Sequence, residues 1–211
     1  DRTNLTRIHA PAWGSYSVPV PNRCVTFGVI LKNNLEQGTS MIKKKICLIG
    51  SFAVGKTSLL ERFVHNRFDD KYLTTIGVKI SQKTLPPVQD PISGRVVQYA
   101  FLIWDIAGME KFDTLAMNYY RGASGALAVA DLTRRETIFQ LQDICDKFRS
   151  VSPAARLLII GNKLDIFQQD RETMILLKKT VSNLSAEYLL TSAKTGQGVE
   201  EAFLELAKRI R

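Results

Sequence analysis

The octapeptide GSFAVGKT at residues 50–57 is compatible with only a few folds. It matches the pattern GxxxxGKS/T at every fixed position, follows directly after the apolar run 46–49, and precedes apolar residues at helical spacing over 58–64. A buried parallel strand, a glycine-rich loop and a helix in this order form a phosphate cradle, because the loop and the helix N-terminus present backbone N–H groups with partial positive charge. A glycine-rich turn that binds nothing is the alternative.

Seven residues of this segment are candidate phosphate contacts. Lys56 adds a full positive charge near the β- and γ-phosphates of a nucleotide, and the Thr57 hydroxyl can ligate Mg2+. The candidates are Gly50, Ala53, Val54, Gly55, Lys56, Thr57 and Ser58.

The composition is that of an ordinary globular chain and excludes several kinds of chemistry. Of 211 residues, 45% are hydrophobic and 23% are charged, and no apolar run approaches the roughly 18 residues of a membrane-spanning helix. Three widely spaced cysteines form neither a disulfide framework nor a CxxC metal pair, which predicts a reducing, intracellular setting. Two histidines in unrelated contexts leave almost nothing for a histidine metal site or a Ser/His/Asp triad.

The positive net charge does not by itself identify a partner. It amounts to +9, from 29 basic and 20 acidic residues, and could attract a polyanion such as nucleic acid or an anionic membrane surface. The basic residues are dispersed, however, and their short clusters lack the interleaved aromatic residues of a single-strand binder. We expect solvated surface charge and no nucleic-acid partner.

Two stretches of different character meet near Met41. Residues 1–40 contain scattered Pro, Gly, Asn, Ser and Thr without a sustained period, and they lack the order of a secretory signal. From Met41 three lysines lead into the apolar strand. We expect residues 1–40 to be an N-terminal extension, disordered or not part of the native protein, with Met41 as the physiological start and one domain over 41–211.

A second group of metal-binding and phosphate-sensing residues follows the apolar run 99–103. Asp105, in the sequence WDIAG, can hold Mg2+ through water, and Gly108 can bring its N–H against the γ-phosphate because it has no side chain. The polar loop 68–77 contains threonines that can reach the metal with a hydroxyl and the γ-phosphate with the backbone. Loss of the γ-phosphate would release both loops, which describes a two-state switch.

Two further motifs follow predicted strands at 156–161 and 188–191, and carboxyl ends of parallel strands are where open α/β sheets bind ligands. Asp165 can accept from N1–H and the exocyclic amino group of guanine, whereas adenine presents an acceptor at that ring position. We expect Asn162 to brace the neighbouring loops, Lys163 to cover the base with its alkyl stem, and the Ala193 N–H to serve guanine O6. The base-binding candidates are Asn162, Lys163, Asp165, Ser192, Ala193 and Lys194.

The segments GSFAVGKT, TIGV, WDIAG, NKLD and SAK occur in this order, and over 41–211 the chain resembles a Ras-superfamily small GTPase of the Rab branch. The Rab character lies in TIGV, Trp104, YYRGA at 119–123 and DLTRRET at 131–137. The resemblance implies an α/β fold of the P-loop GTPase type, with helices on both faces of a mostly parallel six-stranded sheet. One antiparallel strand would come from a hairpin around 78–104.

The resemblance also implies an activity and further site residues. Thr75, rather than Thr74, corresponds to the threonine that ligates the metal and aligns water through its carbonyl. Phe68 corresponds to an aromatic residue that stacks on guanine, and Tyr72 to a tyrosine that closes over the phosphates. The implied activity is a switch that binds GTP or GDP with Mg2+ and slowly hydrolyses GTP by in-line attack of water. The implied catalytic groups are Lys56, Thr75 and Gly108, the metal ligands are Thr57, Thr75 and Asp105, and effectors and regulators would bind the switch loops 68–78 and 105–121.

Two residues depart from the family pattern where hydrolysis would occur. Met109 stands where the family usually has the glutamine that orients the attacking water, and a thioether cannot replace its hydrogen bonds. We expect intrinsic hydrolysis to be slower by about 10- to 100-fold unless Glu110 substitutes. Phe52 replaces a small residue beside the γ-phosphate, where its ring would obstruct an arginine finger or pack onto the switch loops. A GTP-binding module that does not hydrolyse is the alternative function, and a P-loop ATPase is a third.

Three local expectations complete the sequence analysis. The Pro-rich segment 85–95 predicts an exposed loop without regular ladder pairing, and Thr133 with Glu136 predicts a capping box for the next helix. The chain stops inside a predicted helix with one apolar face and has no C-terminal cysteine to prenylate. We therefore expect a cytoplasmic protein without a lipid anchor; tail-less Rab-like domains are also known among prokaryotic small GTPases.

Overall fold

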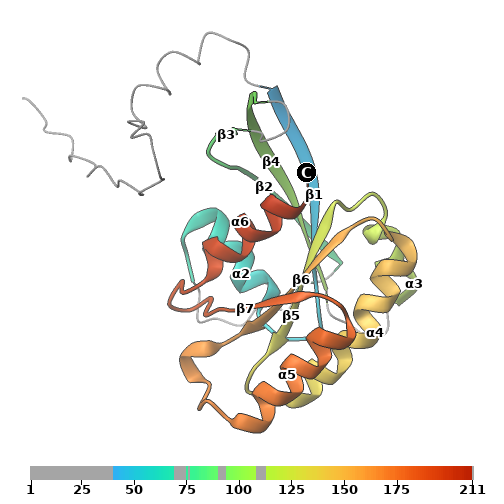
Figure 1. The fold of residues 1–211 in the computed structure, drawn as a ribbon, viewed down its shortest axis with the longest axis vertical. Helices are drawn as coiled ribbons and strands as arrows, with labels where there is room; N and C mark the ends of the chain where they lie inside the picture. The colour runs from blue at the N-terminus through green and yellow to red at the C-terminus, as the bar shows by residue number, and fades with distance from the viewer. Residues whose placement is uncertain (1–39, 69–74, 76, 90–93, 108–112, 211) are drawn as a thin grey trace, which may run out of the picture. The chain divides into compact units, whose positions relative to one another are not determined.

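Strands and helices alternate along the chain except between residues 78 and 106, where three strands follow one another. The computed structural model describes residues 40–68, 75, 77–89, 94–107 and 113–210. The strands are β1 (Ser40–Ile49), β2 (Val78–Thr84), β3 (Val88–Gln89), β4 (Val96–Ile106), β5 (Gly125–Asp131), β6 (Arg156–Asn162) and β7 (Glu187–Leu190) (Figure 1). The helices are α2 (Lys56–His65), α3 (Asp113–Tyr120), α4 (Arg135–Val151), α5 (Arg171–Asn183) and α6 (Val199–Arg209), and a short 3-10 turn, η2, spans Leu164–Ile166.

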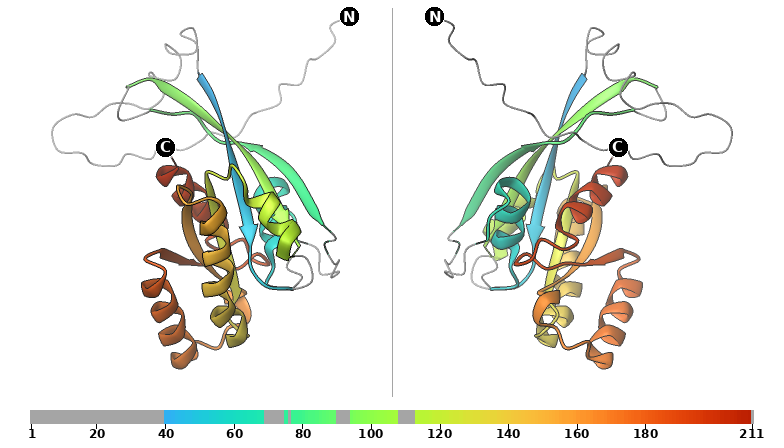
Figure 2. Two further views of the ribbon diagram at one scale, coloured as in Figure 1. Left: turned by 90° about the vertical axis from the view of Figure 1, so that its right-hand side faces the viewer. Right: turned by 90° about the vertical axis from the view of Figure 1, so that its left-hand side faces the viewer.

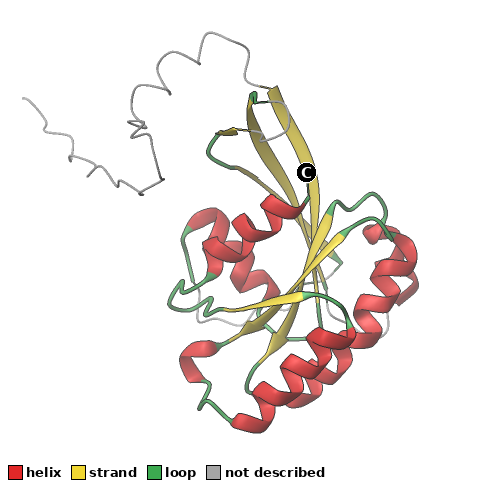
Figure 3. Cartoon of the chain, in the orientation of Figure 1, coloured by secondary structure: helices red, strands yellow, loops and turns green. Residues whose placement is uncertain are grey.

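The strands form one sheet in the order β2-β4-β1-β5-β6-β7, with β3 also paired to β4. The pairs β1/β4, β1/β5, β5/β6 and β6/β7 are parallel, whereas β2 and β3 run antiparallel to β4. Helices α2 and α6 cover one face and α3, α4 and α5 cover the other (Figures 1 and 3). The expected mostly parallel six-stranded α/β sheet is confirmed, and the two-residue strand β3 pairs with β4 in addition to this six-strand order.

The apolar run in β1 lies at the centre of this sheet. Residues 46–49 have at most 1% of their surface exposed. Ile46 and Leu48 pack in the cluster that includes α2 and α6, while Cys47 and Ile49 pack in the cluster on the opposite face. A strand buried on both faces reads as a continuous apolar run, which explains why this segment is not alternating. The strand runs directly into the loop that leads to α2 (Figure 2).

The segment 85–95 agrees only in part with the expected exposed loop, since Pro86, Pro87, Gly94 and Arg95 are exposed but two other residues form a strand. The two residues of β3 pair with the start of β4, and residues 90–93 lie outside the described part of the chain. Leu85 is 5% exposed, and its N–H donates to the Tyr99 carbonyl at 2.8 Å. Pro86 and Pro87 separate β2 from β3 and interrupt the pairing with β4 there. Leu85 enters the core because burial of its apolar side chain is favourable.

The prediction of a capping box at the start of α4 was wrong. The N-cap of α4 is Arg134, which makes no side-chain cap bond. The Thr133 hydroxyl and N–H instead donate to Asp131 Oδ1 at 2.7 and 3.0 Å. A buried carboxylate at the end of β5 competes for Thr133, and a charged acceptor forms the stronger hydrogen bond.

The apolar face predicted near the chain's end packs as α6. Phe203 and Leu206 are fully buried, and the Phe203 ring stacks on Phe63 of α2 with centroids 3.8 Å apart. No helix within the described ranges combines the length and the hydropathy that crossing a bilayer requires.

Candidate functional site

Two glycines of the phosphate loop allow it to pass close to neighbouring strands. Gly50 and Gly55 have φ of +140° and +98°, in the region that L side chains rarely adopt. A Cβ on Gly50 would lie 2.3 Å from the Val129 carbonyl oxygen of β5, and one on Gly55 would lie 2.3 Å from Asn162 Nδ2 of β6. The spacing of the motif therefore follows from the contacts of the loop with β5 and β6.

Lys56 is the first residue of α2 and is 6% exposed. Its Nζ donates to the carbonyls of Gly50 and Ser51, both at 2.7 Å. Burial lowers the pKa of Lys56 to about 8, against a raising effect of Asp105 and with a smaller lowering effect of Arg134. The ammonium is held at the mouth of the loop, where an anion would favour its charged form.

A hydroxyl and carboxylate cluster lies beside the loop. The Thr57 hydroxyl donates to Asp105 Oδ2 at 2.5 Å, and Thr75 Oγ1 lies 2.8 Å from Thr57 Oγ1. Asp105 is fully buried, and burial raises its pKa against the hydrogen bond from Thr57 and the charge of Lys56. Its Oδ1 atom has no hydrogen-bond partner among the described residues. An orphaned carboxylate oxygen next to two hydroxyls is a donor set of hard oxygens, which fits Mg2+.

The base-reading candidates lie at the ends of β6 and β7. Ser192 is buried and donates its hydroxyl to Asp165 Oδ1 at 2.6 Å, while Asp165 itself is exposed. The Ser192 oxygen also accepts from the Thr195 N–H at 3.1 Å. Ser192 therefore fixes the direction of the Asp165 carboxylate without contacting the cavity itself.

Asn162 joins the base end to the phosphate end. It is 1% exposed, and its Nδ2 donates to the Val54 carbonyl at 2.9 Å. Its Oδ1 accepts from the Thr191 hydroxyl at 3.1 Å and from the Ala193 N–H at 3.2 Å. These bonds are the brace expected of Asn162. They also engage the Ala193 N–H, which we expected to serve guanine O6.

A network around Asp131 was not anticipated from the sequence. The Asp131 side chain is 1% exposed, and its Oδ2 pairs with Lys163 Nζ at 2.7 Å and with Arg134 Nε at 3.0 Å. Arg134 Nη2 donates in turn to the Phe52 carbonyl at 2.8 Å. Burial alone would raise the pKa of Asp131, but the bonds from Lys163, Thr133 and Arg134 outweigh it and lower that pKa. The available signal was an acidic residue ending the otherwise apolar strand GALAVAD.

Arg62 of α2 is a second residue that the sequence did not reveal. Its Nε donates to the Ala193 carbonyl at 2.9 Å, and its Nη2 donates to the Lys194 carbonyl at 2.5 Å. These two bonds hold the loop after β7 against α2. An arginine in an amphipathic helix carries no sequence signal for such a contact.

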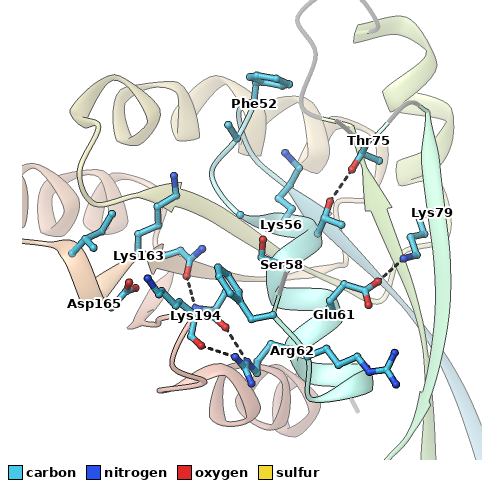
Figure 4. A pocket seen from close by; sticks show the side chains of 18 of the residues that line it. Phe52, Lys56, Ser58, Glu61, Arg62, Thr75, Lys79, Lys163, Asp165 and Lys194 are labelled. Carbon is cyan, nitrogen blue, oxygen red and sulfur yellow. Dashed lines mark hydrogen bonds and ion pairs between the residues drawn. The ribbon is translucent and has the colours of Figure 1, made fainter. Parts of the chain in front are cut away.

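Residues from the phosphate loop, α2, the end of β6 and the loop after β7 line one cavity of about 1060 Å3. Lys163 and Asp165 lie at one end of it and Thr75 at the other, with Lys56 between them (Figure 4). Of the predicted residues, those that line it are Ala53, Gly55, Lys56, Thr57, Ser58, Phe68, Thr75, Asn162, Lys163, Asp165, Ala193 and Lys194. Gly50, Val54, Asp105 and Ser192 are buried and do not line it, and Thr74, Tyr72, Gly108, Met109 and Glu110 lie outside the described residues.

Phe52 lies at the rim of the cavity with 44% of its surface exposed. Two outcomes were expected for its ring, obstruction of an incoming arginine or packing on the switch loops. The second concerns segments 69–74 and 108–112, which lie outside the described residues.

A phosphate loop between a central parallel strand and a helix, with a carboxylate and hydroxyl cluster beside it, defines a P-loop nucleotide-binding protein. The Ras family model matches residues 45–211. The chain is 36% identical over 168 residues to Ras-related protein Rab-1C of Dictyostelium discoideum. The aligned region covers 79% of this chain and 80% of that protein. The corresponding figures are 34% over 174 residues, covering 82% of each, for Rab-4 of the same organism. They are 35% over 167 residues, covering 79% of this chain and 71% of the relative, for Rab-21 of Homo sapiens.

The chain therefore belongs to the Ras family and is Rab-like. It is a GTP-binding molecular switch with GTPase activity. Proteins of this family bind GTP or GDP with Mg2+ and act on protein effectors.

Proposed function

We propose that the cavity is the guanine-nucleotide site, with the base against Asp165 and the phosphates between the phosphate loop and Lys56. The observation that supports this proposal is the convergence of three separate segments on one cavity. The phosphate loop, the turn that contains Asp165, and Thr57, which binds the buried Asp105, supply these contacts. Phe68 lines the same cavity and supplies an aromatic surface for the base.

Guanine specificity rests on the direction of the Asp165 carboxylate. The Ser192 hydroxyl donates a hydrogen bond to Asp165 Oδ1 and so fixes the orientation of the carboxylate. A carboxylate fixed in this way can accept two hydrogen bonds from guanine, whereas adenine would leave it facing an acceptor. Lys163, tied to Asp131, lays its alkyl stem along the same end of the cavity.

Thr57, Thr75 and the buried Asp105 would hold Mg2+. The ion, when bound, neutralises charge on the β- and γ-phosphates. In the proposed reaction, the water oxygen attacks the γ-phosphorus in line with the β–γ bridging oxygen, whose bond to that phosphorus breaks to give GDP and inorganic phosphate. Lys56 stabilises the charge that develops on the phosphoryl oxygens, Thr75 aligns the water through its carbonyl, and the Gly108 N–H holds the γ-phosphate.

We propose that hydrolysis by this chain is slow. Met109 follows the WDIAG motif, and its thioether can neither donate to the attacking water nor accept from it well. The missing hydrogen bonds correspond to a deficit of about 10- to 100-fold.

The finer biological features are proposals as well. Effectors and regulators would bind the switch loops 68–78 and 105–121, with no nucleic-acid partner. Residues 41–211 would form the nucleotide-binding domain. Cys47 and Cys145 are buried free thiols, which fits action in the reducing cytoplasm.

The nucleotide that copurifies with the protein tests this proposal. The denatured protein should release GDP or GTP and no adenine nucleotide when its supernatant is separated by chromatography. Excess ATP should fail to displace bound fluorescent GDP, and excess GTP should displace it. Displacement by ATP and GTP alike would contradict the assignment of Asp165.

A further inference from the structure

Arg134 connects two parts of the site that the nucleotide itself would span. Its guanidinium donates from Nε to Asp131 Oδ2 at 3.0 Å and from Nη2 to the Phe52 carbonyl at 2.8 Å. Asp131 is the last residue of β5, and Phe52 is the third residue of the phosphate loop. The planar guanidinium is suited to this position because its nitrogens can donate to two fixed acceptors at once.

The Asp131 carboxylate is buried and held by several hydrogen bonds. The Asp131 carboxylate is 1% exposed, and its other oxygen accepts from the N–H and the hydroxyl of Thr133. Lys163, which lines the base end of the cavity, binds the same Oδ2 atom at 2.7 Å. One buried carboxylate thus positions a cation on the base side and a cation on the phosphate side.

Other bonds hold the remainder of the loop. Lys56 binds the carbonyls of Gly50 and Ser51, and Asn162 binds the carbonyl of Val54. The Phe52 carbonyl lies between these anchored peptides, and Arg134 reaches it from the start of α4. Each anchored carbonyl fixes the orientation of the peptide that follows it, and loop N–H groups must stay aligned to bind phosphate.

We propose that Arg134 is a positioning residue that pins the phosphate loop at Phe52 and thereby slows the release of nucleotide. The inference rests on the proposed nucleotide site. The guanidinium that holds the loop binds the same carboxylate as Lys163. Asp131 therefore links the residues at the base end of the site to those at the phosphate end.

Three variants of the full chain separate this role from charge and from folding. Arg134→Ala removes both bonds, yet Lys163 remains to neutralise the buried Asp131, which protects the fold. Arg134→Lys keeps the charge but cannot fork between two acceptors. Arg135→Ala is the matched control, because the neighbouring Arg135 pairs with Asp170 and Glu172 at the exposed start of α5.

The measurement is the dissociation rate of fluorescent GDP and of a fluorescent non-hydrolysable GTP analogue in excess Mg2+, together with thermal unfolding. We expect Arg134→Ala to accelerate release by about tenfold and Arg134→Lys by nearly as much. Arg135→Ala should stay within about twofold of wild type, since exposed ion pairs contribute little. If Arg134→Ala and Arg135→Ala lose similar thermal stability, only Arg134→Ala should release nucleotide faster.

Two results would overturn the inference. Release from Arg134→Ala at the wild-type rate would mean that the loop does not depend on this bond. Full restoration by Arg134→Lys would mean that charge suffices and that the fork is irrelevant. The same series measures guanine-nucleotide binding by the wild-type protein. If the wild type binds, the proposed function is unaffected by either result. If the wild type does not bind, the proposed function itself is refuted.

Discussion

Replacing Asn162 by alanine tests how strongly the two ends of the site depend on one side chain. The change removes three hydrogen bonds, one from Nδ2 to the Val54 carbonyl and two to Oδ1 from Thr191 and Ala193. Neutral hydrogen bonds contribute roughly 1 kcal/mol each, so the free energy of unfolding should fall by about 3 kcal/mol. Asn162 is 1% exposed, so water cannot readily replace the lost partners, and about 3 kcal/mol is a lower bound on the loss.

Asn162→Asp refines the comparison. It retains acceptor oxygens for Thr191 and Ala193 but loses the donor to Val54 and brings a carboxylate oxygen against that carbonyl. Both variants should accelerate nucleotide release by at least about tenfold, because the phosphate loop loses its anchor to β6.

Urea unfolding of the nucleotide-free protein gives the stability change, and release of fluorescent GDP gives the functional change. Asn183→Ala, at the exposed end of α5, is the control for replacing an asparagine. A loss below about 1 kcal/mol in Asn162→Ala, with release at the wild-type rate, would refute the reasoning that Asn162 joins the loops.

Three further predictions follow from individual residues. Met109→Gln should raise single-turnover GTP hydrolysis by about 10- to 100-fold; an unchanged rate would contradict our explanation of slow turnover. Gly55→Ala should abolish tight nucleotide binding in equilibrium titrations, because φ is +98° and the new Cβ would lie 2.3 Å from Asn162 Nδ2, and binding at wild-type affinity would disprove the clash. The pKa of Asp131 is lowered on folding, so its contribution to stability is present above the unfolded value of about 4 and is lost as the pH falls through the folded value. The free energy of unfolding should therefore decline less steeply in acid for Asp131→Asn than for wild type.

Much of the fold and part of the site can be predicted from short segments. The run 46–49 predicts a strand covered on both faces, because such a strand has a continuous apolar sequence. Residues 50–57 predict the loop and the start of α2, because the spacing of the fixed residues is visible along the chain. The order of motifs also places Lys56, Asp105 and Asp165 near one edge of a parallel sheet, where the structure has them.

Local patterns fail where a distant group competes. Thr133 matches a capping box, yet it binds Asp131, and Leu85 sits in a Pro-rich segment, yet it enters the core. In both cases a buried partner supplies more free energy than the local motif.

The links that organise the site arise from tertiary packing. Arg134 and Phe52 are 82 residues apart, and Arg62 and Ala193 are 131 residues apart. No sequence period relates such residues, since their contact depends on the order of strands in the sheet and on which helix covers which face. The motifs thus specify the chemistry of a nucleotide switch, whereas the fold selects the side chains that hold those motifs in place.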